Sequence, residues 1–287
     1  MKSFLLHVVV ILMFLASIFL VSYPFISNYL MGLNQNSKIE SYEQEVQAID
    51  EIDAGAARKD AEEYNKSLFG KAVLTDPFDP TIERAKDLEY ENLLNPGYNS
   101  IMASVRIPAI DVNLPIFHGT SEEVLQVGIG HLQGSSLPVG GKGTHVILAG
   151  HAGLSTAKLF TDLSLIEEGD VFYIHCLNEI LAYQVDQIKI VEPEDTRDLK
   201  IDPKQDYVTL VTCTPYGINS HRLLVRGVRI PYEETEEIAG SILKTSESVW
   251  MKEYKMALFI GSILFIIMLA IFTIVRKKAT KKECKQS

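Results

Sequence analysis

The sequence predicts a mainly β fold, a closed or nearly closed barrel with short helices, between two apolar terminal segments. Three observations lead to this prediction. Short runs of β-type residues, separated by Gly, Pro and Asn, fill residues 101–232. Residues 35–70 instead repeat apolar residues at helical spacing. Uncharged apolar blocks lie near both ends of the 287-residue chain, which is long enough for one or two domains.

The first apolar block covers residues 4–21 and contains one histidine and no charged residue. It is long enough to cross the hydrocarbon core of a membrane. The alternative is a cleaved signal peptide, but only Lys2 precedes the run and the following VSYPFISNYL has no small-x-small cleavage site. We therefore expect residues 1–22 to form an uncleaved N-terminal transmembrane anchor.

The second apolar block, residues 256–275, has no charged residue and is followed by the basic tail 276–287. Within this tail, residues 276–285 hold six Lys or Arg and one Glu. The positive-inside rule places such a tail in the cytoplasm. Two membrane spans then put both termini in the cytoplasm and the region between them outside the cell membrane.

The region between the two expected spans is acidic. The whole chain has a net charge of −10 and a hydrophobic content of 47%. Removing the +5 of the tail and the charge of Lys2 leaves −16 for residues 3–275. This balance argues against nucleic acid or an anionic membrane surface as a partner. A solvated surface explains the charge without an acidic functional site.

Residues 35–70 are expected to form two helices. Apolar residues recur at helical spacing with polar residues between them, at Ile39, Tyr42, Val46, Ile49 and Ile52. The stretch DAGAARKDAEEYNKSLFG is typical of a second helix that ends at Gly70. Because the pattern is too short for a free coiled coil, we expect a helical hairpin that packs against another domain.

A proline-rich loop follows these helices. Pro77 and Pro80 remove backbone donors and fix φ, so this stretch does not continue a helix. The tip of the loop, Asp76-Pro77-Phe78, carries a carboxylate and an aromatic ring. From the residues alone, an ordinary proline-rich loop is the plain interpretation. Residues 35–100 together make up the expected helical region and loop.

The expected barrel covers residues 101–232. Its β-type runs are ASVRIPAIDVNLPIFHG, THVILAGH, DVFYIHCL, ILAYQVDQIKIVE, DYVTLVTC and RLLVRGVRI. Helical stretches are few in this region, and we expect them at SEEVLQVG and TAKLFTDLSLI. Residues 233–255 are then expected to form a helical connector to the second span.

Three residues at the ends of expected strands suit chemistry. His151 follows VILAG, Cys213 follows VTLVT, and Arg222 opens the next strand. If the intervening loop closes as a hairpin, Cys213 and Arg222 face each other at one rim, and Arg226 lies deeper on the same face. A nearby imidazolium or guanidinium favours the reactive thiolate, and a guanidinium can also hold an oxyanion. The three residues together therefore suit acyl transfer through a thioester.

Each of these residues also has an ordinary interpretation. A lone His is most often a hydrogen-bonded loop residue, an Arg a surface residue, and a Cys in an apolar strand an inert buried thiol. Cys176 and Cys213 could form a disulfide in an oxidising space, whereas Cys284 lies in the cytoplasm on this topology. A zinc site at His175, Cys176, Cys213 and His151 is only weakly indicated, because the chain has no CxxC or HExxH.

Several of these segments resemble the sortase family. TLVTC at residues 209–213 looks like the TLxTC signature of sortases, and LAGHAG and HRLLVRG resemble the family's segments around its histidine and arginine. RIPAIDVNLPIFHGT is similar to its opening strands. The match runs in order over residues 101–230. The resemblance implies a sortase-type β-barrel and a cysteine transpeptidase of Gram-positive bacteria that works outside the membrane.

The rest of the chain resembles class C, the pilin-polymerising branch of the family. An N-terminal helical region, the Asp76-Pro77-Phe78 segment and a second transmembrane segment after the barrel carry this resemblance. In class C, an Asp-Pro-aromatic segment forms a lid over the active site. The resemblance therefore implies an autoinhibitory lid here, in which Phe78 covers Cys213 and Asp76 engages Arg222.

The same resemblance implies a role for each catalytic residue. Cys213 attacks the Thr–Gly bond of an LPxTG-like sorting signal, and His151 supplies the proton for the leaving group. Arg222 positions the substrate and stabilises the oxyanion. A lysine amine of the next pilin subunit then resolves the thioester and forms an isopeptide link. The implied partners are thus pilin subunits that carry an LPxTG-like sorting signal and an acceptor lysine.

Two alternatives to this function stay open at the level of the sequence. A sortase that anchors proteins to the cell wall would use the same three residues with a peptidoglycan-precursor amine. A non-enzyme alternative is a membrane-anchored extracellular β-domain that binds a partner and holds a structural disulfide between Cys176 and Cys213. No metal or organic cofactor is implied, since thioester exchange needs only a thiol, an acid and an oxyanion donor.

Overall fold

The protein is described from a computed structural model. It describes residues 2–68, 74–79, 81–82, 87–97, 99–154, 156–232, 248–249, 251–252 and 254–263. The chain divides into two compact units, residues 1–245 and 246–287. In the second unit, residues 254–263 are helical. Most of the expected connector and second span, and all of the basic tail, lie outside the described residues.

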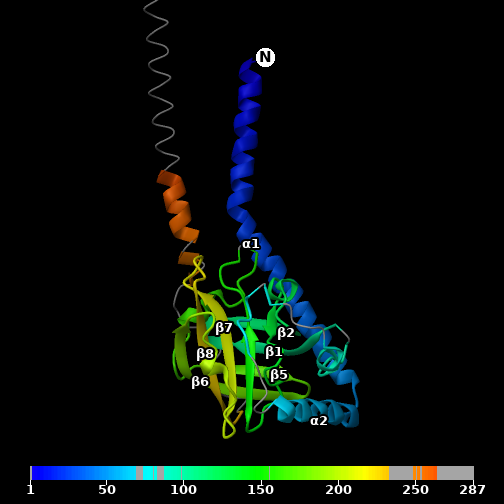
Figure 1. Ribbon diagram of the computed structural model, residues 1–287. Coiled ribbons are helices and arrows are strands. Elements are labelled where there is room, and N and C mark those ends of the chain that lie inside the picture. Colours follow the sequence, from blue (N-terminus) through cyan, green and yellow to red (C-terminus); the bar gives the residue numbers. More distant parts are fainter. Residues whose placement is uncertain are drawn as a thin grey trace, which may run out of the picture. The chain divides into compact units, whose positions relative to one another are not determined.

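Eight described strands form a closed barrel, as the sequence predicts (Figure 1). Their order around the barrel is β1-β2-β3-β4-β7-β8-β6-β5, and β5 closes the ring by pairing with β1. The strands are β1 (Ile101–Ile107), β2 (Val112–His118), β3 (Ile129–His131), β4 (Thr144–Ala149), β5 (Val171–Cys176), β6 (Glu179–Val191), β7 (Asp206–Thr214) and β8 (His221–Ile230). The β2–β3 and β4–β7 pairs are parallel, and the other pairs are antiparallel.

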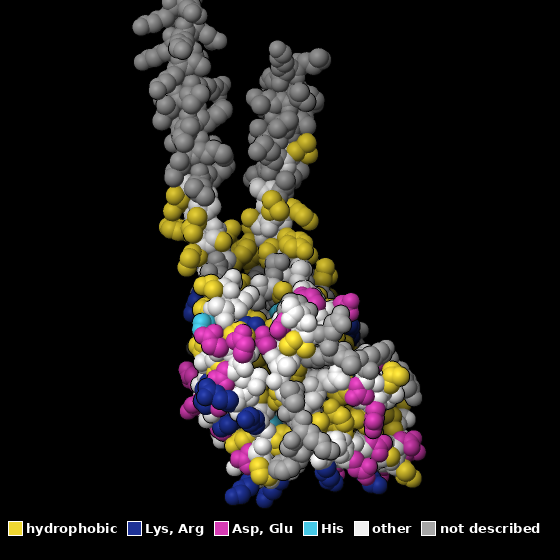
Figure 2. All heavy atoms as spheres, in the orientation of Figure 1, with side chains coloured by type: hydrophobic (Ala, Val, Ile, Leu, Met, Phe, Trp, Pro, Cys, Tyr) yellow, Lys and Arg dark blue, Asp and Glu magenta, His cyan; other side chains and the backbone are white. Residues whose placement is uncertain are grey.

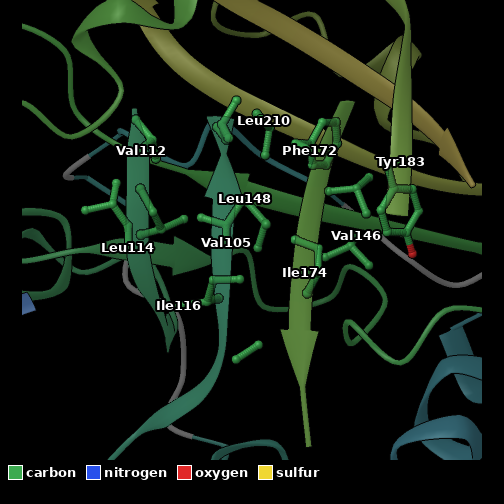
Figure 3. Close-up of a cluster of buried hydrophobic side chains, with 14 of the residues drawn as sticks. Val105, Val112, Leu114, Ile116, Val146, Leu148, Phe172, Ile174, Tyr183 and Leu210 are labelled. Carbon is green, nitrogen blue, oxygen red and sulfur yellow. The ribbon is translucent and has the colours of Figure 1, made fainter. Parts of the chain in front are cut away.

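The barrel interior is filled with apolar side chains from opposing strands (Figure 3). Strand β4 contains the run VILA, in which apolar residues follow one another without alternating with polar ones. Val146 and Leu148 point into the main core, whereas Ile147 belongs to a second apolar cluster on the other face of the strand. Because successive side chains of a strand point to opposite faces, a strand that is covered on both faces has no solvent-facing positions that would need polar residues.

The two expected N-terminal helices are present, and the first is much longer than expected. Helix α1 covers Lys2–Ala48 and α2 covers Glu51–Leu68. The Tyr42 hydroxyl in α1 donates to the Met102 carbonyl at 2.9 Å and accepts from the Leu177 amide at 2.9 Å. In α2, Asn65 exchanges two hydrogen bonds with the backbone of Leu137. Both helices therefore pack on the barrel, as the hairpin prediction requires.

Two expected helices inside the barrel region are shorter than the sequence suggests. SEEVLQVG forms α4 over Glu122–Leu125 only. The stretch TAKLFTDLSLI forms a 3₁₀-helix over Thr161–Leu165 instead of an α-helix. Leu159 has a φ of +39°, a left-handed conformation through which an α-helix cannot run. The expectation of a longer helix there is therefore wrong. A further short helix, α3, spans Leu88–Asn92 before the first strand.

The surface of the barrel unit is mixed in charge. On the face that Figure 2 shows, acidic and basic side chains are interspersed over the domain, and hydrophobic side chains are exposed along α1. Phe19, Tyr23 and Tyr29 are among these exposed residues of α1. Within the described part of the chain, no helix is both long enough and apolar enough to cross a membrane. The two expected spans therefore stay predictions.

Candidate active site

The parallel pairing of β4 with β7 brings two of the candidate residues to one end of the barrel. Ala149 pairs with Val211, and the Gly150 amide donates to the Val211 carbonyl at 3.0 Å. The Thr212 hydroxyl donates to the Gly150 carbonyl at 2.7 Å. Carboxyl ends of parallel strands meet at the same edge of a sheet, so the residue after each strand is presented there. This places His151 at the edge where β7 ends.

Cys213 and Arg222 are directly opposed across the antiparallel β7–β8 pair, which confirms the predicted hairpin. Cys213 is a free thiol and is 8% exposed. Burial raises the pKa of the Cys213 thiol, the Arg222 charge opposes this shift, and the Asp76 carboxylate adds to it. The net pKa of the thiol lies above its ordinary value, mainly through burial, so the thiol form is favoured in this conformation.

Arg222 is held by the proline-rich loop that precedes the barrel. Its Nε and Nη2 atoms donate to the two carboxylate oxygens of Asp76, at 2.8 Å and 2.6 Å. Its Nη1 atom donates to the carbonyls of Asn219 and His221. Both side chains of the ion pair are largely buried. In this conformation the guanidinium fork is fully occupied by protein groups.

The Phe78 ring lies against His151 and Arg222 at this edge. Its ring centroid is 5.5 Å from that of His151 and 5.3 Å from Arg222 Cζ. The Phe78 amide donates to Asp76 Oδ1 at 3.3 Å, which fixes the turn between the two residues. The ring also packs on the second apolar cluster, which consists of Leu132, Ile147, Leu199, Val211 and Leu224. The 76–78 segment therefore lies against His151 and Arg222, at the edge that also carries Cys213.

His151 is held by its backbone, while one of its ring nitrogens has no hydrogen bond. The His151 carbonyl accepts from the Phe160 amide at 3.1 Å. The Nε2 atom is buried and makes no hydrogen bond, but it lies 3.4 Å from Glu122 Oε2. The sequence analysis missed Glu122. It lies 29 positions before His151 in the chain, in a short helix whose pattern carries no chemical signal.

The second cysteine of the barrel is not part of this site. Cys176 and Cys213 are both free, so the structural disulfide that the sequence left open as an alternative does not form. Cys176 is buried at the end of β5, where its thiol donates to the Met102 carbonyl at 3.6 Å. Burial raises the pKa of the Cys176 thiol to about 12. Among the residues that the structure describes, no group of three or more His, Cys, Asp or Glu is arranged to hold a metal ion.

The sequence also did not predict a buried hydrogen bond between His145 and Thr209, the first residue of the TLVTC segment. The Thr209 hydroxyl is 2.7 Å from His145 Nε2, and His145 Nδ1 is 2.9 Å from the Lys200 carbonyl. Since a carbonyl accepts only, Nδ1 carries the proton and Nε2 accepts from Thr209. Both ring nitrogens of His145 are thus satisfied, which indicates a structural role.

The comparisons with known proteins agree with this architecture. The Sortase domain family model matches residues 105–230. The structure of sortase C-1 from Streptococcus pneumoniae is 48% identical, with a TM-score of 0.62 over 69% of this chain and 100% of that chain. Sortase C1 of Streptococcus agalactiae is 45% identical, with a TM-score of 0.64 over 70% of this chain and 98% of that chain.

A curated relative is more distant. Sortase A of Streptococcus agalactiae serotype III is 28% identical over 136 residues, which are 45% of this chain and 55% of that protein. The matched part therefore spans about half of the length of this curated relative.

A closed barrel with a free cysteine, an arginine and a histidine at one edge defines a thiol-dependent class of enzyme. The chain belongs to the sortase family, and the solved structures that it resembles are class C sortases. Sortases are cysteine transpeptidases.

Proposed function

We propose that this chain polymerises pilin subunits, by cleaving an LPxTG-like sorting signal and joining it to a lysine amine of the next subunit. The observation that carries the proposal is the direct opposition of Cys213 and Arg222 across β7 and β8. Together with His151 at the same edge, it gives the thiol, the acid and the oxyanion donor that acyl transfer through a thioester needs.

The first half of the reaction uses all three residues. The Cys213 thiolate attacks the carbonyl carbon of the Thr–Gly bond, and Arg222 donates hydrogen bonds to the oxygen that becomes negative. The C–N bond then breaks as the imidazolium of His151 gives its proton to the leaving amine. The products are a thioester on Cys213, a neutral His151 and a free amine.

The 76–78 segment is proposed to be an autoinhibitory lid. Its carboxylate occupies both donor positions of the Arg222 fork, and its aromatic ring lies against His151. A substrate carbonyl cannot reach Arg222 until Asp76 leaves. Departure of Asp76 would also remove a charge that raises the pKa of Cys213, so opening the lid favours the thiolate. Opening and activation are therefore coupled in this proposal.

Pilin as the substrate is supported by the relatives rather than by the catalytic residues. The similar sortase C of Streptococcus pneumoniae is described in terms of pilin substrate specificity, and a similar Streptococcus agalactiae sortase C1 comes from a pilus island. A lid and a second apolar segment also distinguish the proposal from a cell wall-anchoring sortase. We further propose that residues 1–22 and 256–275 anchor the chain in the cell membrane with the barrel outside.

The decisive experiment is the detection of a thioester by intact mass. The full-length chain in detergent is incubated with an LPxTG-type peptide, as the parent, as Cys213→Ala and as Phe78→Ala. We expect an adduct in Phe78→Ala, less adduct in the parent, and none when Cys213 is replaced. If Phe78→Ala also gives no adduct, the transpeptidase proposal is wrong for this chain.

Phe78→Ala also tests the lid by itself. The ring contributes apolar contact to the second cluster and covers His151 and Arg222, so its removal exposes the edge. We expect a thiol reagent to label Cys213 about tenfold faster, which corresponds to about 1.4 kcal/mol of lost closure. Cys176 serves as an internal control, because it is buried elsewhere and its labelling should not change. Unchanged labelling of Cys213 would exclude the lid.

A further inference from the structure

We propose that Glu122 receives the ammonium group of the acceptor lysine in the second half of the reaction. The inference rests on the proposed function, since it concerns the amine that resolves the thioester on Cys213. It assigns recognition of a cationic acceptor to a carboxylate outside the three catalytic residues.

Glu122 is exposed and yet is held at the active-site histidine. Its side chain is 70% exposed, and its Oε2 atom lies 3.4 Å from His151 Nε2. Its other carboxylate oxygen accepts from Gln126 Nε2 at 2.5 Å. The carboxylate is therefore oriented with one oxygen toward His151 while it stays open to solvent.

The backbone under Glu122 is fixed as well. The Ser121 side chain caps α4 by accepting from the Val124 amide. Leu125 in the same turn is buried in the domain. A capped turn with a buried anchor holds the position of its exposed side chains. Glu122 is thus positioned by the fold and is not simply one of many surface carboxylates.

The carboxylates on the Arg222 side of the edge lie close to Arg222 or His221. Asp76 is bound to Arg222, and Glu194 also acts on the charge of Arg222. Glu192 Oε1 lies 3.3 Å from His221 Nε2. Glu122 lies instead beside His151, the group that must accept a proton from the incoming amine. A lysine that approaches the thioester from this side meets a carboxylate first.

The proton balance of aminolysis explains why a carboxylate is useful there. After the first half reaction His151 is neutral, whereas the incoming lysine carries three N–H protons and a positive charge. His151 takes one proton, the nitrogen attacks the thioester carbon, and the C–S bond breaks. The second proton goes to the departing sulfur of Cys213, and the third stays on the new amide. A carboxylate beside His151 stabilises the ammonium at encounter and the imidazolium that follows.

The test separates the two half reactions in the full-length chain carrying Phe78→Ala. A thioester is formed with an LPxTG-type peptide and then resolved with a lysine-bearing peptide or with hydroxylamine, a neutral amine at the assay pH. We expect Glu122→Gln to slow resolution by the lysine peptide about two- to fivefold, within the range for an exposed ion pair. Thioester formation and resolution by hydroxylamine should slow by a smaller factor, because both use the charge of His151 but neither brings a cationic nucleophile to Glu122. The ratio of the lysine rate to the hydroxylamine rate should therefore fall. Added salt should reduce the difference between the two nucleophiles.

Glu123→Gln is the matched control, because it removes the same charge from the next exposed residue of the same turn. It should leave the preference for the lysine peptide intact. Equal slowing of both nucleophiles, by the same factor as thioester formation, would mean that Glu122 acts only through His151 and would overturn the inference. An unchanged preference in Glu122→Gln would overturn it too. Failure of every variant to form a thioester would instead overturn the proposed function, and this inference with it.

Discussion

Two levels of the β7–β8 strand pair can be compared: the edge at Cys213 and Arg222, here called the mouth of the barrel, and the level four residues deeper. Both levels carry similar types of side chain, but the partners of these side chains differ. At the mouth, Cys213 pairs with Arg222 across β7 and β8. Deeper in the same pair of strands, Thr209 pairs with Arg226. Each pair places a hydroxyl or thiol side chain opposite a guanidinium. Residue type alone therefore does not distinguish the two positions.

Each arginine is bound by an aspartate through two hydrogen bonds. Arg222 is bound by Asp76 at 2.8 Å and 2.6 Å, and Arg226 by Asp186 at 3.1 Å and 2.7 Å. Asp186 belongs to β6, which pairs directly with β8, so its partner is fixed by the sheet. Asp76 belongs to a loop that precedes the barrel in the chain and can leave without breaking a strand pair.

A histidine completes each group, His145 within β4 and His151 just after it, and the two histidines differ in the same way. His145 is buried and has both ring nitrogens bonded. His151 has its Nε2 atom without a hydrogen bond, and its side chain is 19% exposed. The partners of the deeper group thus belong to the barrel itself, while the group at the mouth is covered by a loop from outside the barrel. A binding site requires partners that can be replaced by substrate.

The largest effect is expected from Asp76→Asn, with Asp186→Asn as the matched control. Asp76→Asn keeps the shape of the lid but removes the negative charge that binds Arg222. We therefore expect labelling of Cys213 to rise at least about tenfold. Two causes act together, because the lid loosens and the pKa of Cys213 falls when the Asp76 charge is removed. Asp186→Asn should leave labelling unchanged. Equal effects of the two variants would show that the lid does not control access.

The pH dependence of the free energy of unfolding tests whether burial in the deeper group keeps the imidazole of His145 neutral. Burial lowers the pKa of His145, in the deeper group, from 6.5 to about 4, and it does the same for His131, a second buried histidine at the end of β3 and outside this group. Between these pH values the unfolded chain binds more protons than the folded one, so stability is complete above 6.5 and is lost as the pH falls. We expect the free energy of unfolding to fall by about 2 kcal/mol per histidine between pH 7 and pH 5.

Urea unfolding at the two pH values measures this loss. His145→Gln is expected to remove the share of one histidine from the pH-dependent loss while His131 keeps its own. A profile that stays flat in the parent protein would mean that neither imidazole is held neutral by burial.

The smallest effect is expected from Thr209→Val. The substitution removes the hydroxyl that donates to His145 Nε2 and leaves a buried acceptor unsatisfied. We expect a loss of about 1 to 2 kcal/mol in the free energy of unfolding. Labelling of Cys213 should stay the same, because Thr209 lies in the deeper group. A changed labelling rate in a fully folded variant would show that the two groups are coupled.

Most of the barrel could be predicted because its strands are marked locally. The runs that end in Cys213 and begin at Arg222 are long, apolar and separated by a short turn, so their antiparallel pairing follows. Strand β3 was missed, because Ile129–His131 is too short to show a period. The long helix at TAKLFTDLSLI was wrong because the left-handed residue Leu159 interrupts it.

The candidate site was predictable to the same extent as the strand ends that carry it. His151, Cys213 and Arg222 each follow or open a strong strand, and the sequence therefore places them at edges. Glu122 gave no such signal, because its contact with His151 depends on how α4 packs beside the β4 edge. The bond between Asp76 and Arg222 joins residues 146 positions apart, and only the family resemblance pointed to it.

The sequence by itself determined the strands, their turns and the residues at their ends, because these depend on local pattern and on backbone sterics. The tertiary structure decided which cysteine, histidine and arginine meet at one edge of the barrel. This edge and the deeper level differ in the solvent exposure of each side chain and in which segment of the chain supplies its hydrogen-bond partner. Both properties depend on how the barrel closes and on where the loop at 76–78 packs, and neither can be read from residue type alone.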